Sequence, residues 1–163
     1  MPEYDYTIRN LVIKQKATFN LIELYNTLKE WFSFHGYTLF EKEYNDEIKG
    51  NKKNLSIKWE AKKEIDEYLS FGINIGIKIT NYKIITSKKE KLMEGNLKIE
   101  FESYKESDYN ERWERTILTK FIRGAYDKMI NNKKYEKYEK TLKNQTIEVF
   151  NKTKFFLNMY KFK

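Results

Sequence analysis

Six apolar residues occupy consecutive odd-numbered positions from Leu69 to Ile79, and this alternation constrains the fold more than any other feature of the chain. A period of two residues is that of a β-strand, whose successive side chains point to opposite faces. At about 3.3 Å per residue, the segment spans roughly 36 Å. Its even-numbered side is small or polar and includes Gly72 and Gly76. The pattern therefore predicts a long strand with one buried face and one face in water.

Shorter segments with strand-like patterns lie on both sides of this one, at residues 6–14, 37–44, 55–61 and 97–101. The later strands follow one another too closely for crossover helices, so we expect an antiparallel sheet of about five strands. Residues 45–54 and 88–91 are charged and are predicted to form hairpin turns. The apolar phase changes after Asn81, which predicts a β-bulge or a turn there.

Helix signals flank the strand region. Asn20 and Glu23 form a capping box, and apolar residues at helical spacing follow as far as Gly36, which predicts a helix over residues 21–35. A second capping box, Asp108 with Glu111, predicts a helix over residues 108–129. A further helix is predicted over residues 133–160, with its seam at Tyr135, Tyr138, Leu142, Val149, Phe156 and Met159.

These elements predict an α+β fold. We expect one helix after the first strand and a long C-terminal helical segment packed on the antiparallel sheet. A length of 163 residues suits one domain, made of an α+β core over residues 1–130 and a basic amphipathic helix over residues 131–163.

The element order resembles the helix-grip fold of START-like domains, in which a curved antiparallel sheet grips a late amphipathic helix. The resemblance covers roughly residues 4–129 and rests on the strand from Leu69 to Ile79 with its glycines Gly72 and Gly76, and on the helix beginning at Asp108. The chain differs in its single early helix, its fewer strands and its added basic helix. The resemblance implies a cavity for an apolar ligand between sheet and helix. Its candidate lining, which would alternatively be plain core, is Trp59, Phe71, Ile75, Phe101, Trp113 and Phe121.

Recognised catalytic motifs are absent from the sequence. The chain has no cysteine, which excludes disulfides, thiolate catalysis and cysteine-ligated metals. Its single histidine, His35, falls where the first helix should end and would favour the helix dipole. Phosphate loops, dinucleotide fingerprints and nucleophile elbows do not occur. We therefore expect a non-enzymatic protein without a metal or cofactor, although a site made only of carboxylates would leave no such signature.

Positive charge is concentrated at the C-terminal end. The net charge is +8, and residues 128–163 contain 10 lysines against 3 glutamates. Such a face suits the phosphates of nucleic acid, an anionic membrane surface or an acidic protein, and a plain solvated face is the alternative. The residues in question are Lys133, Lys134, Lys137, Lys140 and Lys143, interleaved with Tyr135 and Tyr138.

The last residues are apolar on nearly every side, which is typical of a buried helix. They would dock on the sheet of the same chain, on a second copy, or shallowly in a bilayer. The candidates for self-association are Phe155, Phe156, Met159, Tyr160 and Phe162.

Location and function are predicted only in general terms. The first residues lack the basic and apolar regions of a secretion signal, and the longest uncharged stretches are 10 residues, against about 20 for a membrane span. We expect a cytoplasmic protein that binds an apolar ligand or a protein partner between sheet and helix. Nucleic-acid binding by the basic helix and assembly through the apolar C-terminus are the alternatives.

Overall fold

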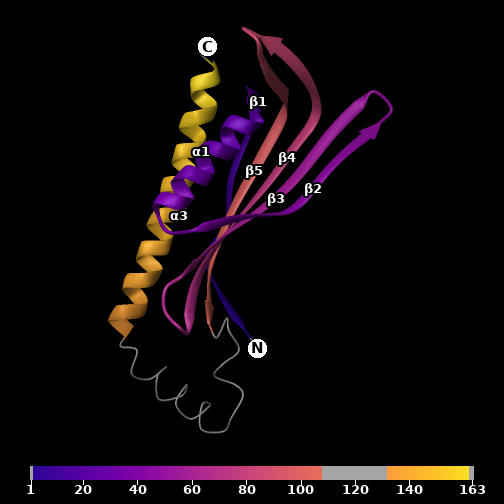
Figure 1. Ribbon diagram of the computed structural model, residues 1–163. Helices are drawn as coiled ribbons and strands as arrows, with labels where there is room; N and C mark the ends of the chain where they lie inside the picture. The colour runs from indigo at the N-terminus through magenta and orange to yellow at the C-terminus, as the bar shows by residue number, and fades with distance from the viewer. Residues whose placement is uncertain (1, 108–131, 162–163) are drawn as a thin grey trace.

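The computed structural model describes residues 2–107 and 132–161, which form an antiparallel sheet and two helices (Figure 1). This confirms the predicted α+β fold. The predicted helix over residues 108–129 lies outside the described residues. In chain order the elements are β1 (Glu3–Phe19), α1 (Leu21–Phe34), β2 (Thr38–Lys49), β3 (Lys52–Glu64), β4 (Leu69–Ser87), β5 (Glu90–Ser107) and α3 (Asn132–Lys161).

The sheet has five strands in the order β1-β5-β4-β3-β2, and all neighbours are antiparallel. Strands β2 to β5 follow one another as hairpins, whereas β1 pairs with β5 at the far edge. Helix α1 carries the chain from the β1 edge to the β2 edge. A long helix, α3, then packs against β1 and β5. The arrangement is loosely compatible with a helix-grip fold.

Both described helices lie on the same side of the sheet (Figure 1). The odd-numbered side chains of β4 point to this side, and all six from Leu69 to Ile79 are at most 2% exposed. Helix α1 adds four buried side chains, Leu24, Leu28, Trp31 and Phe32, to the same hydrophobic core. Neither described helix covers the opposite side of the sheet, which carries the even-numbered residues of β4. We call it the open face.

The sequence predicted the seam of α3 only in part. Leu142 and Val149 are buried as expected, but Met159 is 49% exposed, so its assignment to the seam was wrong. The seam passes instead through two threonines, each of which donates a hydrogen bond to the carbonyl four residues earlier, at 2.7 and 2.8 Å. That bond satisfies the hydroxyl and makes its burial tolerable. The buried residues are Leu142, Thr146, Val149, Thr153, Leu157 and Tyr160.

The structure confirms two local predictions. The side chain of Asn20 accepts a bond from the Glu23 backbone at 3.1 Å and caps α1. The register between β4 and β5 shifts after Thr80, and Asn81 has a positive φ of 52°, which confirms the bulge. The expected loop over residues 45–54 was too long, because β2 and β3 continue to pair up to Lys49 and Lys52. Backbone pairing there does not depend on the polar side chains.

Neither of the two helices within the described residues is long and apolar enough to cross a membrane.

The seam of α3 generates a stability prediction. Leu157→Ala removes a fully packed side chain and should lower the free energy of unfolding by about 2–5 kcal/mol. Met159→Ala, two residues away on the exposed side, should change it by no more than about 0.5 kcal/mol. Denaturant unfolding of both variants measures the difference. Equal effects would contradict the packing of α3 described here.

Candidate functional site

The predicted pocket residues within the described chain lie between sheet and helices. Trp59, Phe71, Ile75 and Phe101 are at most 3% exposed. Three of their rings meet aromatic rings of the helices: Trp59 meets Tyr25, Phe71 meets Tyr138 and Phe101 meets Phe150, at centroid distances of 5.2, 6.1 and 5.7 Å. These four side chains pack against other residues of the core cluster.

Trp113 and Phe121 lie outside the described residues, as does the helix predicted to cover the apolar site. The apolar cavity therefore stays a prediction. The hollows that the described residues line include three on the open face, which is on the other side of the sheet from the predicted apolar cavity.

The tyrosines of α3 contact the sheet as well as one helix lysine, since the Lys134 ammonium lies 5.7 Å from the centroid of the Tyr138 ring. Lys134, Lys137, Lys140 and Lys143 are exposed. The Tyr138 ring packs on Phe71 of the core, and the Tyr135 ring lies 5.5 Å from the buried Lys105 ammonium. Both tyrosines are thus engaged with the sheet. The side chain of Lys133 lies outside the described residues.

The predicted self-association residues are divided between two environments. Phe155 is 67% exposed, and Met159 is also exposed. Phe156 is half-buried against the core, and Tyr160 is buried and donates a hydrogen bond to Glu90 at 3.1 Å. Phe162 lies outside the described residues. The C-terminal part of α3 therefore packs on the sheet with the side opposite to Phe155.

His35 is the C-cap residue of α1, where the sequence placed it. Its Nδ1 lies 2.9 Å from the Trp31 carbonyl oxygen, and its ring stacks on the Trp31 indole at 3.9 Å. These contacts give the only histidine a structural role at the end of the helix.

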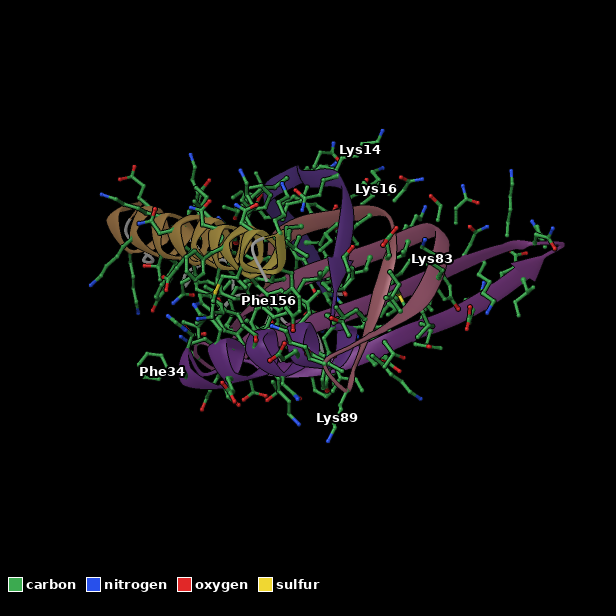
Figure 2. The ribbon with its side chains drawn as sticks, turned by 90° about the horizontal axis from the view of Figure 1, so that it is seen from above. Lys14, Lys16, Phe34, Lys83, Lys89 and Phe156 are labelled. Carbon is green, nitrogen blue, oxygen red and sulfur yellow. The ribbon has the colours of Figure 1, made fainter. Side chains whose placement is uncertain are left out.

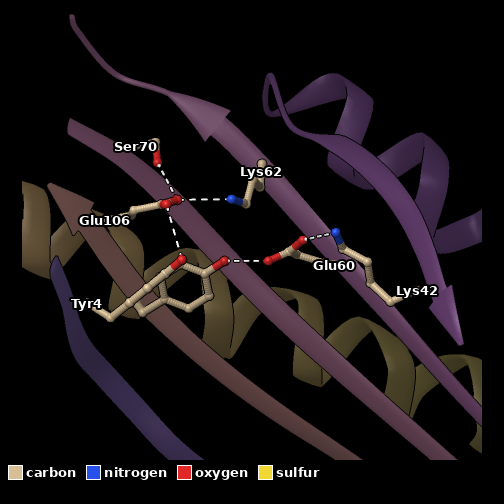
Figure 3. A network of polar contacts seen from close by, with 7 residues as sticks. Tyr4, Lys42, Glu60, Lys62, Ser70 and Glu106 are labelled. Carbon is tan, nitrogen blue, oxygen red and sulfur yellow. Dashed lines mark hydrogen bonds and ion pairs between the residues drawn. The ribbon is translucent and has the colours of Figure 1, made fainter. Parts of the chain in front are cut away.

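One end of the open face holds a polar network that reaches across the strands (Figure 3). The Glu60 carboxylate on β3 accepts a hydrogen bond from the Tyr104 hydroxyl at 2.6 Å and pairs with the Lys42 ammonium at 2.9 Å. Tyr104 reaches Glu60 across β4 because Gly72 lies beneath its ring. A Cβ atom at Gly72 would overlap that ring. The glycine therefore makes the contact between β5 and β3 possible.

A second carboxylate, Glu106 of β5, completes the network. It is 4% exposed and pairs with the Lys62 ammonium at 2.9 Å. The hydroxyls of Ser70 and Tyr4 also donate to it, at 3.4 and 3.3 Å. Both buried or half-buried carboxylates at this end of the face are thus neutralised by their own chain.

These contacts change the ionisation of two groups. Burial alone would raise the pKa of Glu60, but hydrogen bonds from Tyr104 and Lys42 and the charge of Lys62 outweigh burial and hold that pKa below its usual range. Burial would lower the pKa of Lys62, but the hydrogen bond and charge of Glu106 raise it instead. Both groups are therefore held in their charged forms.

Three lysines lie directly opposite one another at the other end of the open face. Lys14 of β1 pairs in register with Lys98 of β5, which pairs with Lys78 of β4. Neighbouring strands are about 4.8 Å apart, so the three side chains start side by side. We call this row the lysine ladder. With Lys16, it lines a hollow of about 440 Å³. Figure 2 shows Lys14 and Lys16 projecting from β1 on the side away from α1.

The lysine ladder is short of counter-ions. Lys98 pairs with Glu100 on its own strand. No carboxylate of residues 2–107 or 132–161 pairs with Lys14, Lys16 or Lys78. Like charges placed directly opposite in a sheet are destabilising. The ladder is therefore a concentration of positive charge that does not contribute to folding stability.

A groove lies between the network and the lysine ladder. Its floor is Gly76 of β4, and it has a volume of about 390 Å³. Lys58 and Glu60 form one wall, and Glu100 and Glu102 form the other. A Cβ atom at Gly76 would have no neighbour within 4 Å, in contrast to Gly72. We call this hollow the Gly76 groove.

The Gly76 groove continues into the lysine ladder. A smaller hollow of about 110 Å³ includes Gly76 as well as Lys78 and Lys98 of the ladder. A bound molecule can thus contact the ladder and the groove at once.

Metal binding finds no support in the described part of the chain, where no group of three histidine, aspartate or glutamate side chains is arranged to hold an ion. No family model, curated protein or solved structure matches the sequence. The candidate site therefore rests on the geometry of the open face alone.

Sequence reasoning missed the lysine ladder and the Gly76 groove. The alternation of β4 and β5 already placed Lys78 and Lys98 on the polar sides of their strands. Their alignment with Lys14 depends on the register between β1, β5 and β4, which no single segment encodes.

The two glycines of β4 provide a matched pair of variants. Gly72→Ala forces the Tyr104 ring away from Glu60 and should lower the free energy of unfolding by about 1–3 kcal/mol. Gly76→Ala meets no neighbour and should be neutral, or stabilising by up to about 1 kcal/mol. Denaturant unfolding tests both. A harmless Gly72→Ala would show that Tyr104 does not depend on this glycine.

The depressed pKa of Glu60 predicts how stability responds to acid. A carboxyl whose pKa is lower in the folded state stabilises the fold above the usual glutamate pKa of about 4.3, and this contribution is lost as pH falls through the folded value. Glu60→Gln should therefore flatten the fall in unfolding free energy on acidification. Glu43→Gln, which removes an exposed ion pair with Lys58, is the control. Identical acid profiles for Glu60→Gln and the unsubstituted protein would contradict this prediction.

Proposed function

We propose that this is a non-enzymatic binding protein that binds the phosphate backbone of nucleic acid through the lysine ladder. The observation that carries the proposal is the uneven pairing of charge on the open face. Glu60 and Glu106 are paired within the chain, whereas Lys14 and Lys78 have no carboxylate partner among the described residues. A face that has neutralised these carboxylates and left lysines unpaired is complementary to an anion.

Nucleic acid fits this arrangement because its charge is dense and regular. Each lysine that meets a phosphate releases a condensed counter-ion, which favours binding without regard to sequence. Lysine acts as a point charge and imposes less geometry than arginine does. The net charge of +8 supports the approach of such a partner over longer distances.

The ladder is a better candidate than the basic face of α3. The tyrosines expected to stack on bases beside the helix lysines pack instead on Phe71 and near Lys105. Glutamates also interrupt the helix lysines, and one of them, Glu139, lies 3.5 Å from Lys105.

The helix-grip relationship is a proposal too, supported by the position of β1 beside β5 and of α3 against both.

Two triple variants with equal charge changes test the proposed function. Lys14→Gln, Lys78→Gln and Lys98→Gln together remove the ladder, whereas Lys137→Gln, Lys140→Gln and Lys143→Gln remove charge from α3. Fluorescence anisotropy with a labelled oligonucleotide measures affinity from about 50 mM to about 200 mM salt. The ladder variant should bind at least tenfold more weakly, and its log–log salt slope should fall by about 2.

The helix variant should keep most of its affinity and its salt slope. The proposal would be wrong if the unsubstituted protein did not bind, or if the two variants lost the same affinity. Thermal unfolding of each variant checks that the fold is intact.

A further inference from the structure

The Gly76 groove is a hollow that the fold itself does not fill. Between Ser70 and Gly76 the open face of β4 carries only short side chains, while the flanking walls from β3 and β5 are formed by the longer side chains of Lys58, Glu60, Glu100 and Glu102, so a trough runs along this part of β4. At Gly72 the Tyr104 ring fills the trough, but at Gly76 nothing does. Glycine within a strand often marks a place where a ligand approaches the backbone closely. Gly76 thus leaves a flat stretch of peptide accessible beside the lysine ladder.

The groove wall offers a hydrogen-bond acceptor. One oxygen of Glu102 accepts a bond from the Asn74 amide at 3.3 Å, and the other makes no hydrogen bond to any described residue. In Glu60, by contrast, both oxygens are engaged, by Tyr104 and Lys42. A carboxylate accepts from the amino group of a base such as cytosine, and it repels a phosphate. Glu102 therefore suits the base end of a nucleotide.

Charge changes sign along the open face, from the lysines of the ladder to Glu102, and a nucleotide offers complementary groups: an anionic phosphate and a neutral base edge with hydrogen-bond donors. Lys98 of the ladder and Glu102 of the groove are four residues apart on β5, which is about 13 Å along the strand. The flexible lysine stem shortens or lengthens this span to suit a phosphate at one end and a base edge at the other. The bases of a duplex are stacked and paired, so only an unpaired base can enter such a groove.

We propose that the open face binds single-stranded nucleic acid, with phosphates on the lysine ladder and one unpaired base in the Gly76 groove. The base lies against the Gly76 backbone and donates a hydrogen bond from its amino group to Glu102. Cytosine has such a group, whereas thymine carries a carbonyl oxygen at that position. This inference rests on the proposed function, because the phosphates must first bind the ladder.

The test compares probes that share charge but differ in bases. Full-length protein is titrated with labelled oligo(dC), oligo(dT) of equal length, the oligo(dC) annealed to its complement, and inorganic polyphosphate, which has no bases. The protein should bind oligo(dC) about tenfold more tightly than oligo(dT), the size of one good base contact. It should bind the duplex more weakly than oligo(dC).

Three variants assign the preference to the groove. Gly76→Val fills the groove with a side chain that strands favour, so it should remove the oligo(dC) preference and leave polyphosphate binding unchanged. Glu102→Gln replaces one acceptor oxygen with a donor amide and should reduce the same preference. Glu47→Gln, which is on the same side of the sheet and removes an ion pair with Lys49 outside the groove, should change nothing. Thermal unfolding shows whether each variant is folded. If Gly76→Val does not fold, the oligo(dC) preference of Glu102→Gln alone tests whether the groove binds the base.

The outcomes separate this inference from the proposed function. Equal binding of oligo(dC), oligo(dT) and duplex, with no effect of Gly76→Val or Glu102→Gln, would overturn the base-binding groove and leave phosphate binding by the ladder intact. Failure of every polyanion to bind would overturn both. An oligo(dC) preference that Gly76→Val removes and Glu102→Gln reduces, with polyphosphate binding retained, would establish the groove as a base site.

Discussion

Burial of the odd-numbered side chains of β4 is the constraint on which the rest of the structure depends. The side chains at six consecutive odd positions, from Leu69 to Ile79, are buried on the side of the sheet where α1 and α3 lie. Each such side chain contributes roughly 2 kcal/mol when it leaves water. A slip of one residue in register would expose all six at once, so a shifted register of the central strand would be far less stable. The two glycines of β4 must then lie on the open face.

The same register determines where charge accumulates. Because β4 cannot slip, β5 and then β1 align against it, and Lys78, Lys98 and Lys14 fall into one row. The row is repulsive, and the fold tolerates it because lysine side chains in water spread apart and are screened. A stable apolar face therefore carries an electrostatically unfavourable row on its reverse side, and that row is complementary to an anionic partner.

At one end of the open face the polar side chains are paired within the chain. At the other end Lys14 and Lys78 have no carboxylate partner among the described residues. Around Glu106 and Glu60, ammonium and hydroxyl groups supply partners within the chain, and Tyr104 occupies the space above Gly72. Around Gly76 and the ladder, space and charge remain available. The contrast between two glycines on one strand separates the part of the face that stabilises the fold from the part we propose for binding.

The sequence by itself determined those features that depend on short-range physics. The alternation from Leu69 to Ile79, the Asn20 cap of α1 and the bulge at Asn81 were all readable, because each arises from residues within a few positions of one another. The five-stranded antiparallel sheet followed from the spacing of such segments. The seam of α3 was readable only in part, since nothing in the pattern marks Thr146 and Thr153 as buried.

Only the tertiary structure decided where the candidate site lies. Lys14 and Lys98 are far apart in the chain and become neighbours through the backbone pairing of β1 with β5. The difference between Gly72 and Gly76 arises in the same way, from a tyrosine on another strand that covers one glycine and not the other. Periodicity assigns a residue to a face of its own strand. Its neighbours on that face come from strand pairing, which belongs to two segments together and to neither one alone.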